Sequence, residues 1–280
     1  MILVTGGSGQ LGSELRHLFD EKKVEYLAPS SKELNITDEQ SVLQYVQKLR
    51  PTVIYHCAAY TAVDAAEDEG KELNYLVNKI GTENIAKAAA KVAATIIYIS
   101  TDYVFDGNLT AGEYKVDAQT NPLNEYGKAK LAGEKAIQNF ASKYYIIRTS
   151  WVFGKYGKNF VFTMQRLAKQ HPKITVVADQ FGRPTWTRTL AEFMTYTVEN
   201  HADYGVYHLS NDNACTWYDF ASEILKNDKV EVEPLTSVQF PQKATRPAHS
   251  IMDLSKAKAT GFEIPTWQEA LARMLQSVDK

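Results

Sequence analysis

The chain has 280 residues, which is enough for two domains because a typical domain takes roughly 100 to 200 residues. Its residues are 44% hydrophobic and 23% charged, a composition that excludes a disordered or fibrous protein. The net charge of -2 creates no long-range field that would attract nucleic acid or an anionic membrane surface. We therefore expect neither as a partner, and an anionic ligand would have to bind in a local pocket.

Cysteine usage and the start of the chain predict a cytoplasmic protein. Cys57 and Cys215 are the only cysteines, and their separation fits neither a disulfide framework nor a thiolate metal site. The six histidines show no metal-ligand spacing, so no bound metal is expected. Met1 leads directly into an apolar strand without a signal-peptide pattern, and no apolar run approaches the roughly 20 residues that span a bilayer.

In the first half of the chain, short runs rich in β-branched residues alternate with segments of helical periodicity. One such segment, residues 42–49, carries a single apolar stripe, and Pro51 ends this helix before the next strand. The alternation predicts an α/β fold with a doubly wound parallel sheet of the Rossmann type. The predicted strands are residues 2–7, 24–30, 52–59, 94–100 and 144–153.

After about Trp151 the alternation becomes less regular. Helices are predicted over residues 158–170 and 189–200, and strands over residues 173–179 and 205–210. We expect this part to form a smaller lobe that is interleaved with the first. Two later helices start with capping boxes, formed by Thr216 with Asp219 and by Thr266 with Glu269.

A glycine-rich turn, Gly6–Gly12, follows the first strand and precedes an amphipathic helix. Its glycines fit both GxxGxxG and, starting at Gly7, GxGxxG. Glycine permits the tight turn, the close approach of the backbone to a pyrophosphate and the close packing of the helix on the strand. Because the start of the helix adds unpaired N–H groups and a positive dipole end, this segment predicts a dinucleotide site.

The second predicted strand leaves the choice between NADH and NADPH open. It ends at Ser30, Ser31 and Lys32, without the acidic residue that often binds the ribose 2′-hydroxyl of NAD. These three side chains could hydrogen-bond a 2′-phosphate, or they could simply form a solvated turn. Either reduced cofactor is therefore expected.

Tyr126 and Lys130 form the pattern Tyr-x-x-x-Lys on a segment that suits a helix, so both side chains lie on one face. We expect the ammonium to lower the pKa of the Tyr126 phenol toward working pH, so that its hydroxyl donates a proton to a developing alkoxide. About 25 residues upstream, Thr101 follows a buried strand, and its hydroxyl would polarise the carbonyl that is reduced.

The glycine turn, the strand-end hydroxyl and Tyr-x-x-x-Lys, in this order, resemble the short-chain dehydrogenase/reductase superfamily. Longer strings resemble one branch of its extended type, the dTDP-4-dehydrorhamnose reductases, and the resemblance covers essentially the whole chain. These strings are GGSGQLG, CAAYTAVDAAE, STDYVFDG, NPLNEYGKAKLAGE, RTSWVFG, DQFGRPT and RPAHSIMDLSK.

The resemblance implies a role for each matching residue. Tyr126 would be the proton donor, Lys130 would bind the nicotinamide ribose and tune the phenol, and Thr101 would contact the carbonyl. Asn35 stands where the family commonly has an acidic residue, so its contact with the adenine is left open. The residues implied to bind the cofactor are Gly6, Gly9, Gln10, Leu11, Gly12, Asn35, Ile36, Ile99, Tyr126 and Lys130, with Ala59, Tyr60 and Thr61 in the loop after the fourth strand.

For the substrate, the resemblance implies contacts from Thr101, Asp102 and Trp151, with the tryptophan packing against the sugar. Three cations in the less regular part, Lys158, Arg183 and Arg246, could hold a diphosphate, although each alone could also be a solvated surface charge. The implied reaction transfers a hydride from NAD(P)H to the C4 keto group of dTDP-4-dehydro-L-rhamnose and gives dTDP-L-rhamnose.

These assignments divide the chain into two lobes. We predict a dinucleotide-binding Rossmann domain over residues 1–150, completed by parts of 188–212, and a mostly substrate-binding lobe over residues 151–280. A monomer and a homodimer both remain open. Glu14 aligns with a position that helps hold Mg²⁺ at a dimer contact in some family members, but we identify no further ligands.

Two classes of rival function remain for the same fold: another nucleotide-sugar enzyme, either a dehydratase or an epimerase, and a binding protein. A nucleotide-sugar dehydratase would carry a glutamate after Asp102, where this chain has Tyr103, which argues against it. An epimerase has no such marker. A binding protein, like the regulatory subunit of methionine adenosyltransferase, would keep the fold without catalysis, but the presence of Thr101, Tyr126 and Lys130 favours an enzyme.

Overall fold

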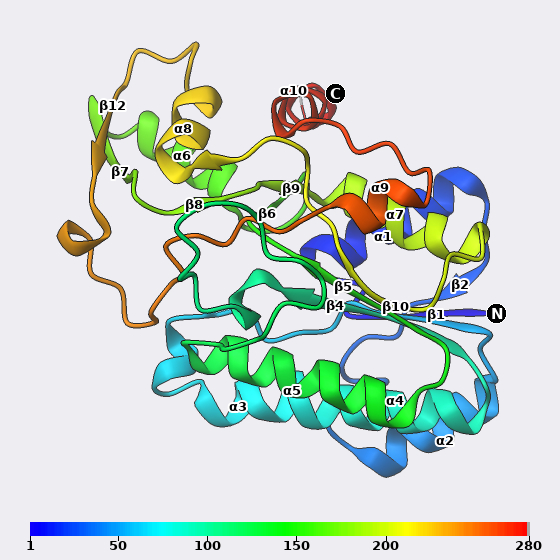
Figure 1. Ribbon diagram of the computed structural model, residues 1–280. Helices are drawn as coiled ribbons and strands as arrows, with labels where there is room; N and C mark the ends of the chain where they lie inside the picture. The colour runs from blue at the N-terminus through cyan, green and yellow to red at the C-terminus, as the bar shows by residue number, and fades with distance from the viewer. Residues whose placement is uncertain (279–280) are drawn as a thin grey trace.

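All six strands of the central sheet run parallel, in the order β10-β5-β4-β3-β1-β2 (Figure 1). A computed structural model describes residues 1–278 of the chain. The middle strands are buried, as apolar parallel strands covered on both faces must be. The strands of this sheet are β1 (Ile2–Thr5), β2 (Tyr26–Leu27), β3 (Val53–His56), β4 (Thr95–Thr101), β5 (Tyr144–Thr149) and β10 (Gly205–His208).

Helices cover both faces of the sheet, which confirms the predicted doubly wound α/β fold (Figure 1). One apolar cluster joins the sheet to α2 and α4, and a second, on the other face, joins it to α1 and α7. The first layer consists of α2 (Glu39–Leu49), α3 (Lys71–Tyr75), the π-helix η2 (Leu76–Gly81), α4 (Thr82–Lys91) and α5 (Glu125–Phe140). The second consists of α1 (Gln10–Lys22), α7 (Thr187–Glu199) and α9 (Ser255–Ala259).

Side-chain caps fix where two helices of the first layer begin. Asp38 accepts hydrogen bonds from the amides of Gln40 and Ser41, and the apolar stripe of α2 then turns Val42 and Val46 into the core. Asn124 accepts a 2.7 Å hydrogen bond from the amide of Gly127 at the start of α5. This cap determines where the first turn of α5 lies relative to the end of β4.

Most residues beyond β5 form a second lobe above one end of the sheet, drawn in green, yellow and red in Figure 1. Its own apolar cluster contains Phe153, Phe220 and Trp267, all fully or nearly fully buried. Its strands are β6 (Val152–Phe153), β7 (Lys173–Val177), β8 (Phe181–Gly182), β9 (Thr185–Trp186), β11 (Cys215–Thr216) and β12 (Glu231–Leu235). Its helices are α6 (Phe160–Ala168), α8 (Trp217–Ile224) and α10 (Trp267–Val278).

Two strand predictions are wrong in their extent. The predicted strand over residues 144–153 is two strands, because Trp151 has a left-handed backbone (φ +47°) that directs β6 away from the sheet to pair with β9. The predicted strand over residues 24–30 contains only two strand residues at the edge of the sheet. Both capping boxes form with reciprocal hydrogen bonds, Thr216 with Asp219 and Thr266 with Glu269.

Late residues return to the sheet: β10 pairs with β5, and α7 packs against α1. The first domain therefore contains residues from both halves of the chain, as expected for interleaved lobes. The lobe boundaries at residue 150 and within 188–212 stay predictions. Within residues 1–278, no helix has the length and hydrophobicity that crossing a membrane requires.

Candidate functional site

A cavity of about 760 Å³ lies at the carboxyl ends of the parallel strands, between the sheet and the second lobe. This is where ligands bind in open α/β sheets, since the helix starts and strand ends converge there. Of the residues predicted to bind cofactor or substrate, those lining the cavity are Gly9, Gln10, Leu11, Ala59, Thr61, Ile99, Thr101, Asp102, Tyr126, Lys130 and Trp151.

The glycine turn between β1 and α1 places bare backbone against this cavity. Gly6 has a left-handed φ of +67°, and a Cβ atom there would come within 2.5 Å of the amide nitrogen of Ala58. A Cβ atom at Gly12 would collide with the carbonyl oxygen of Gly6. Gly9 and Gln10 bring the start of α1 to the cavity, so its N–H groups and dipole are available to a diphosphate. The turn therefore fits a dinucleotide.

The loop of Ala59, Tyr60 and Thr61 follows β3, so the prediction that it follows the fourth strand is wrong: only three strands precede it. Ala59 and Thr61 line the cavity, whereas the Tyr60 backbone is held by the Asn78 carboxamide through two hydrogen bonds. The Tyr60 backbone therefore anchors the loop to Asn78, and Tyr60 itself does not line the cavity.

The residues expected near an adenine lie outside the cavity lining. The Asn35 carboxamide oxygen accepts hydrogen bonds from the amide and hydroxyl of Thr37. Ile36 is buried and packs where a Cβ atom at Gly81 would sit. Both therefore shape the loop after β2, and their contact with a cofactor stays a prediction.

Thr101 and Asp102 close the end of β4. The Thr101 hydroxyl donates to Asp102 Oδ1 at 3.1 Å and accepts from the amide of Tyr103 at 3.2 Å. Asp102 Oδ2 is buried and has no hydrogen-bond partner among residues 1–278. Burial raises the pKa of Asp102 to about 6, although the hydroxyls of Ser250 and Thr101 act in the opposite direction. Asp102 thus borders the cavity with a buried carboxyl group whose nearest hydroxyls are those of Thr101 and Ser250.

Tyr126 lies in the first turn of α5 and lines the cavity close to Thr101. Burial raises the pKa of the Tyr126 phenol, the charge of Asp102 raises it further, and the nearby Thr101 hydroxyl lowers it. The expectation that Lys130 lowers this pKa is wrong: burial and Asp102 raise it, and the Lys130 ammonium lies over the Tyr98 ring instead. A raised pKa keeps the phenol protonated, which suits a proton donor.

Lys130, one turn further along α5, is almost completely buried, and its ammonium lies 4.1 Å from the centre of the Tyr98 ring. Burial lowers the pKa of Lys130 to about 7, while the negative charge of Glu134 acts in the opposite direction. The Glu134 carboxylate is itself held by Arg148, which donates from Nη2 at 2.7 Å and from Nε at 2.9 Å.

Three aromatic residues, Trp151, Phe160 and Trp217, form the second-lobe side of the cavity, called here the aromatic wall. The two indoles are stacked with ring centres 3.7 Å apart and an angle of 13° between their planes. Gly182 lies so close to Trp151 that a Cβ atom would come within 2.6 Å of the indole. Sequence reasoning found Trp151 but missed Phe160 and Trp217, because an aromatic residue at the start of a helix usually signals only core packing.

The three cations considered for a diphosphate lie in different surroundings. Lys158 is exposed and lines the cavity. Arg183 is buried and donates to the Glu113 carboxylate and to the carbonyl of Met252, away from the cavity. Arg246 binds both oxygens of Asp64. Of these three cations, only Lys158 borders the cavity and has no carboxylate partner among residues 1–278.

The position implied for a magnesium ligand does not fit a metal site. Glu14 is buried, accepts a hydrogen bond from the Thr187 hydroxyl and lies 3.7 Å from the guanidinium of Arg188. Arg188 also pairs with Glu21 and Glu192, so an internal cation already neutralises these carboxylates. Among residues 1–278, no group of three or more His, Cys, Asp or Glu side chains is arranged to hold a metal ion.

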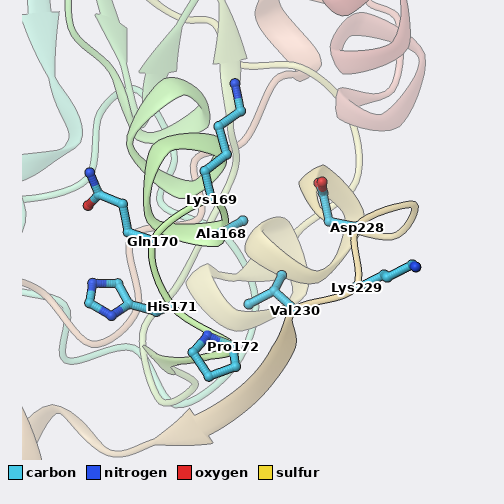
Figure 2. Close-up of a pocket in the computed structure, with 8 residues that line it drawn as sticks. All are labelled: Ala168, Lys169, Gln170, His171, Pro172, Asp228, Lys229 and Val230. Carbon is cyan, nitrogen blue, oxygen red and sulfur yellow. The ribbon is translucent and has the colours of Figure 1, made fainter.

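A second hollow, of about 370 Å³, lies in the second lobe between the end of α6 and the start of β12. In Figure 2 the side chains of Lys169 and Asp228 extend toward the top of the view and that of Lys229 extends to the right, and their charged ends lie apart. Because the polar groups do not converge, this hollow has no arrangement for binding or catalysis.

The sequence of this chain is similar to those of known proteins over its full length. All 280 residues, 1–280, match the model of the family described as RmlD substrate binding domain. The chain belongs to the RmlD family. Among curated proteins, the dTDP-4-dehydrorhamnose reductase of Aggregatibacter actinomycetemcomitans is 40% identical over 96% of each chain. The Escherichia coli K12 enzyme of the same name is 37% identical over 99% of this chain and 97% of its own. The expected family is thereby confirmed.

Solved structures of RmlD family members have the same fold over the full length. The dTDP-4-dehydrorhamnose reductase of Bacillus anthracis, in complex with NADP, gives a TM-score of 0.94 at 41% identity, covering 99% of this chain and 98% of that one. The Clostridium acetobutylicum reductase gives 0.96 at 39% identity, covering 100% and 99%. A Thermus thermophilus UDP-glucose 4-epimerase, 20% identical, shares the fold with a TM-score of 0.83.

Proposed function

We propose that the cavity binds NAD(P)H and a dTDP-linked 4-keto sugar side by side, and that Tyr126 protonates the sugar oxygen as it is reduced. The chain is an NAD(P)H-dependent dTDP-4-dehydrorhamnose reductase, which forms dTDP-L-rhamnose, as its full-length likeness to named reductases indicates. The observation that carries the proposed mechanism is the convergence of Thr101, Tyr126 and Lys130 on one cavity.

Residues at the start of α1 are suited to hold the cofactor, because Gly9, Gln10 and Leu11 border the cavity and no side chain caps the first-turn amides of this helix. When bound, NAD(P)H supplies the hydride. Lys130 is close enough to the same cavity to hydrogen-bond a ribose hydroxyl, and Ile99 offers an apolar surface at the end of β4. The relatives of known structure include complexes with NADP and with NAD, and either cofactor satisfies these contacts.

The sugar would lie between the end of β4 and the aromatic wall. There Tyr126 can donate its proton to the oxygen that gains negative charge, since burial keeps the phenol protonated. Thr101 would turn its hydroxyl from Asp102 to the same oxygen, and the Asp102 carboxylate would accept a hydrogen bond from a sugar hydroxyl. Trp151 would pack on the sugar ring, with Lys158 at the open end near the diphosphate.

Two features favour reduction over the rival functions. The position after Asp102 is Tyr103, whose ring packs edge-on against Tyr126 with centres 6.1 Å apart, so no carboxylate is placed there to assist elimination of water. A complete set of Thr101, Tyr126 and Lys130 around an accessible cavity argues against a purely regulatory protein. Net consumption of NAD(P)H separates a reductase from an epimerase, which regenerates its cofactor.

The test is to mix the purified protein with NADH or NADPH and a panel of dTDP-, UDP- and GDP-linked 4-keto sugars, and to follow loss of absorbance of the reduced cofactor. We expect stoichiometric oxidation with the dTDP-linked 4-keto sugar and the largest kcat/KM for that nucleotide. Absence of turnover with every sugar, despite cofactor binding, would instead support a regulatory role.

We also propose that the protein works in the cytoplasm, in keeping with two cysteines that are both free. Its site uses residues of one chain, so a monomer is sufficient for the proposed chemistry and a homodimer is compatible with it. Sedimentation at several protein concentrations distinguishes these states. The division into a cofactor lobe, residues 1–150 with parts of 188–212, and a substrate lobe over 151–280 is proposed on the same basis.

A further inference from the structure

Tyr98 lies beneath Lys130 and is completely buried in the middle of β4, three residues before Thr101. Its ring faces the Lys130 ammonium at 4.1 Å, and its hydroxyl donates to the backbone carbonyl of Lys130 at 3.2 Å. The ring also stacks on His56, with ring centres 5.7 Å apart. Gly133 permits this packing, because a side chain there would collide with the Tyr98 hydroxyl.

His56 is held rigidly in turn. Its Nδ1 atom lies 2.7 Å from the Thr5 hydroxyl, and its Nε2 atom lies 3.1 Å from the Thr82 hydroxyl. Burial, together with the charge of Lys130, lowers the pKa of His56 to about 3, so the imidazole stays neutral. Tyr98 is therefore fixed on both sides, and the position of its ring cannot change without disturbing β3 and α4.

A buried ammonium usually needs a carboxylate partner, because removal from water disfavours its charged form. Among residues 1–278, Lys130 forms no salt bridge: Glu134, the nearest carboxylate on α5, is occupied by Arg148 and by the Ser100 hydroxyl. An aromatic face stabilises a cation without neutralising it. The Tyr98 ring thus adds to the attraction of Glu134, which raises the pKa of Lys130 without forming a salt bridge with it.

We propose that Tyr98 is a positioning residue that keeps Lys130 charged and directed into the cavity through a cation–π contact. The inference rests on the proposed role of Lys130 in cofactor binding and proton transfer. The other ionisable groups that face Lys130 are His56 and Cys57 at the end of β3, and Glu134 and Tyr126 on α5. The contact explains how the buried Lys130 ammonium can stay charged although it has no salt-bridge partner among residues 1–278.

The experiment weakens the ring's attraction for a cation without changing its shape. Tyr98→Phe is the reference, and 4-fluoro- and 3,4,5-trifluorophenylalanine at the same position remove the negative face stepwise. For each variant, kcat/KM for NAD(P)H is measured from pH 5.5 to 9. We expect kcat/KM to fall on the alkaline side of the profile as Lys130 loses its proton. The pH at the midpoint of this fall should decrease as fluorines are added, by about one pH unit for the trifluoro ring. Equal midpoints in the whole series overturn the proposal.

A matched control is available at a second cation–π pair. Lys256 lies 4.2 Å from the centre of the Tyr207 ring, which is buried on β10 and does not line the cavity. Tyr207→Phe and the same two fluorinated rings at position 207 should leave the pH profile unchanged. A shift there as large as that at position 98 would show that fluorination acts on the fold, and would also overturn the proposal.

Lys130→Met separates this inference from the proposed function. If the methionine variant lost most turnover while the fluorinated series stayed flat, only the role of Tyr98 would be wrong. If it kept wild-type turnover, Lys130 would have no part in the reaction, and both the mechanism and this inference would fail. Thermal unfolding of the fluorinated proteins checks that each ring still packs as phenylalanine does.

Discussion

The two sides of the cavity differ in how their residues are supplied. The sheet side comes from segments in a fixed order along the chain: the glycine turn after β1, Thr101 after β4, and Tyr126 with Lys130 at the start of α5. The aromatic wall is assembled from Trp151 and from the first residues of α6 and α8, which are far apart in sequence. The residues proposed to catalyse the reaction are therefore placed by their spacing along the chain, whereas the proposed substrate contacts are placed by tertiary packing.

The sharpest test of the sheet side is Tyr126→Phe, which keeps the ring and removes the hydroxyl that we propose as the proton donor. We expect turnover to fall by roughly 100- to 10,000-fold, the usual contribution of a positioned general acid, while cofactor affinity is unchanged. Single-turnover rates and fluorescence titration with NAD(P)H measure the two effects. Tyr207→Phe, which alters a phenol outside the cavity, should behave as wild type; equal losses in both variants would contradict the assignment.

Asp102→Asn should raise stability above pH 6 while lowering activity. Burial raises the pKa of this carboxyl from 3.8 to about 6, so ionisation costs more in the folded state than in the unfolded one. Protonated Asp102 therefore adds to the free energy of unfolding of the wild type below about pH 4. This contribution, at most about 3 kcal/mol, is lost as pH rises through 6. Urea unfolding at pH 4 and pH 8 measures it; a pH-independent difference between the two proteins would contradict this prediction.

For the aromatic wall, Trp217→Leu removes the ring that stacks on Trp151. Aromatic pairs contribute about 0.5 to 1.5 kcal/mol beyond their buried area, so KM for the sugar nucleotide should rise roughly 2- to 12-fold with a smaller change in kcat. Tyr218→Leu, on the adjacent position of α8 and outside the cavity lining, is the matched control. An unchanged KM for Trp217→Leu would remove the aromatic wall from substrate binding.

The smallest effect is expected at the rim of the cavity. Lys158→Met should raise KM for the diphosphate-containing substrate by about 2- to 5-fold at low salt, because an exposed charge contributes less than 1 kcal/mol. The difference should shrink as salt is added. Arg183→Met, which removes the partner of Glu113, should lower the midpoint of thermal unfolding and leave KM unchanged. If Arg183→Met raised KM and Lys158→Met only lowered the midpoint of thermal unfolding, Arg183 and not Lys158 would bind the diphosphate.

Much of the fold could be predicted because periodic apolar runs leave few choices: β1, β3, β4 and the capped helices form where expected. The split at Trp151 could not be predicted, since a left-handed tryptophan depends on the neighbouring Gly182. For the site, the spacing of Tyr126 and Lys130 indicated the cavity, but the raised pKa of Tyr126 depends on burial and on Asp102, which only tertiary structure brings near.

The return of the chain to the sheet also constrains how the protein is made. β5 has one edge that stays uncovered until Gly205–His208 pairs with it as β10. During synthesis the growing chain must therefore carry an open, apolar strand edge for nearly sixty residues, a state that is prone to self-association. Expression at low temperature or with chaperones should improve the yield of truncated chains ending before Gly205 far more than that of the full-length protein.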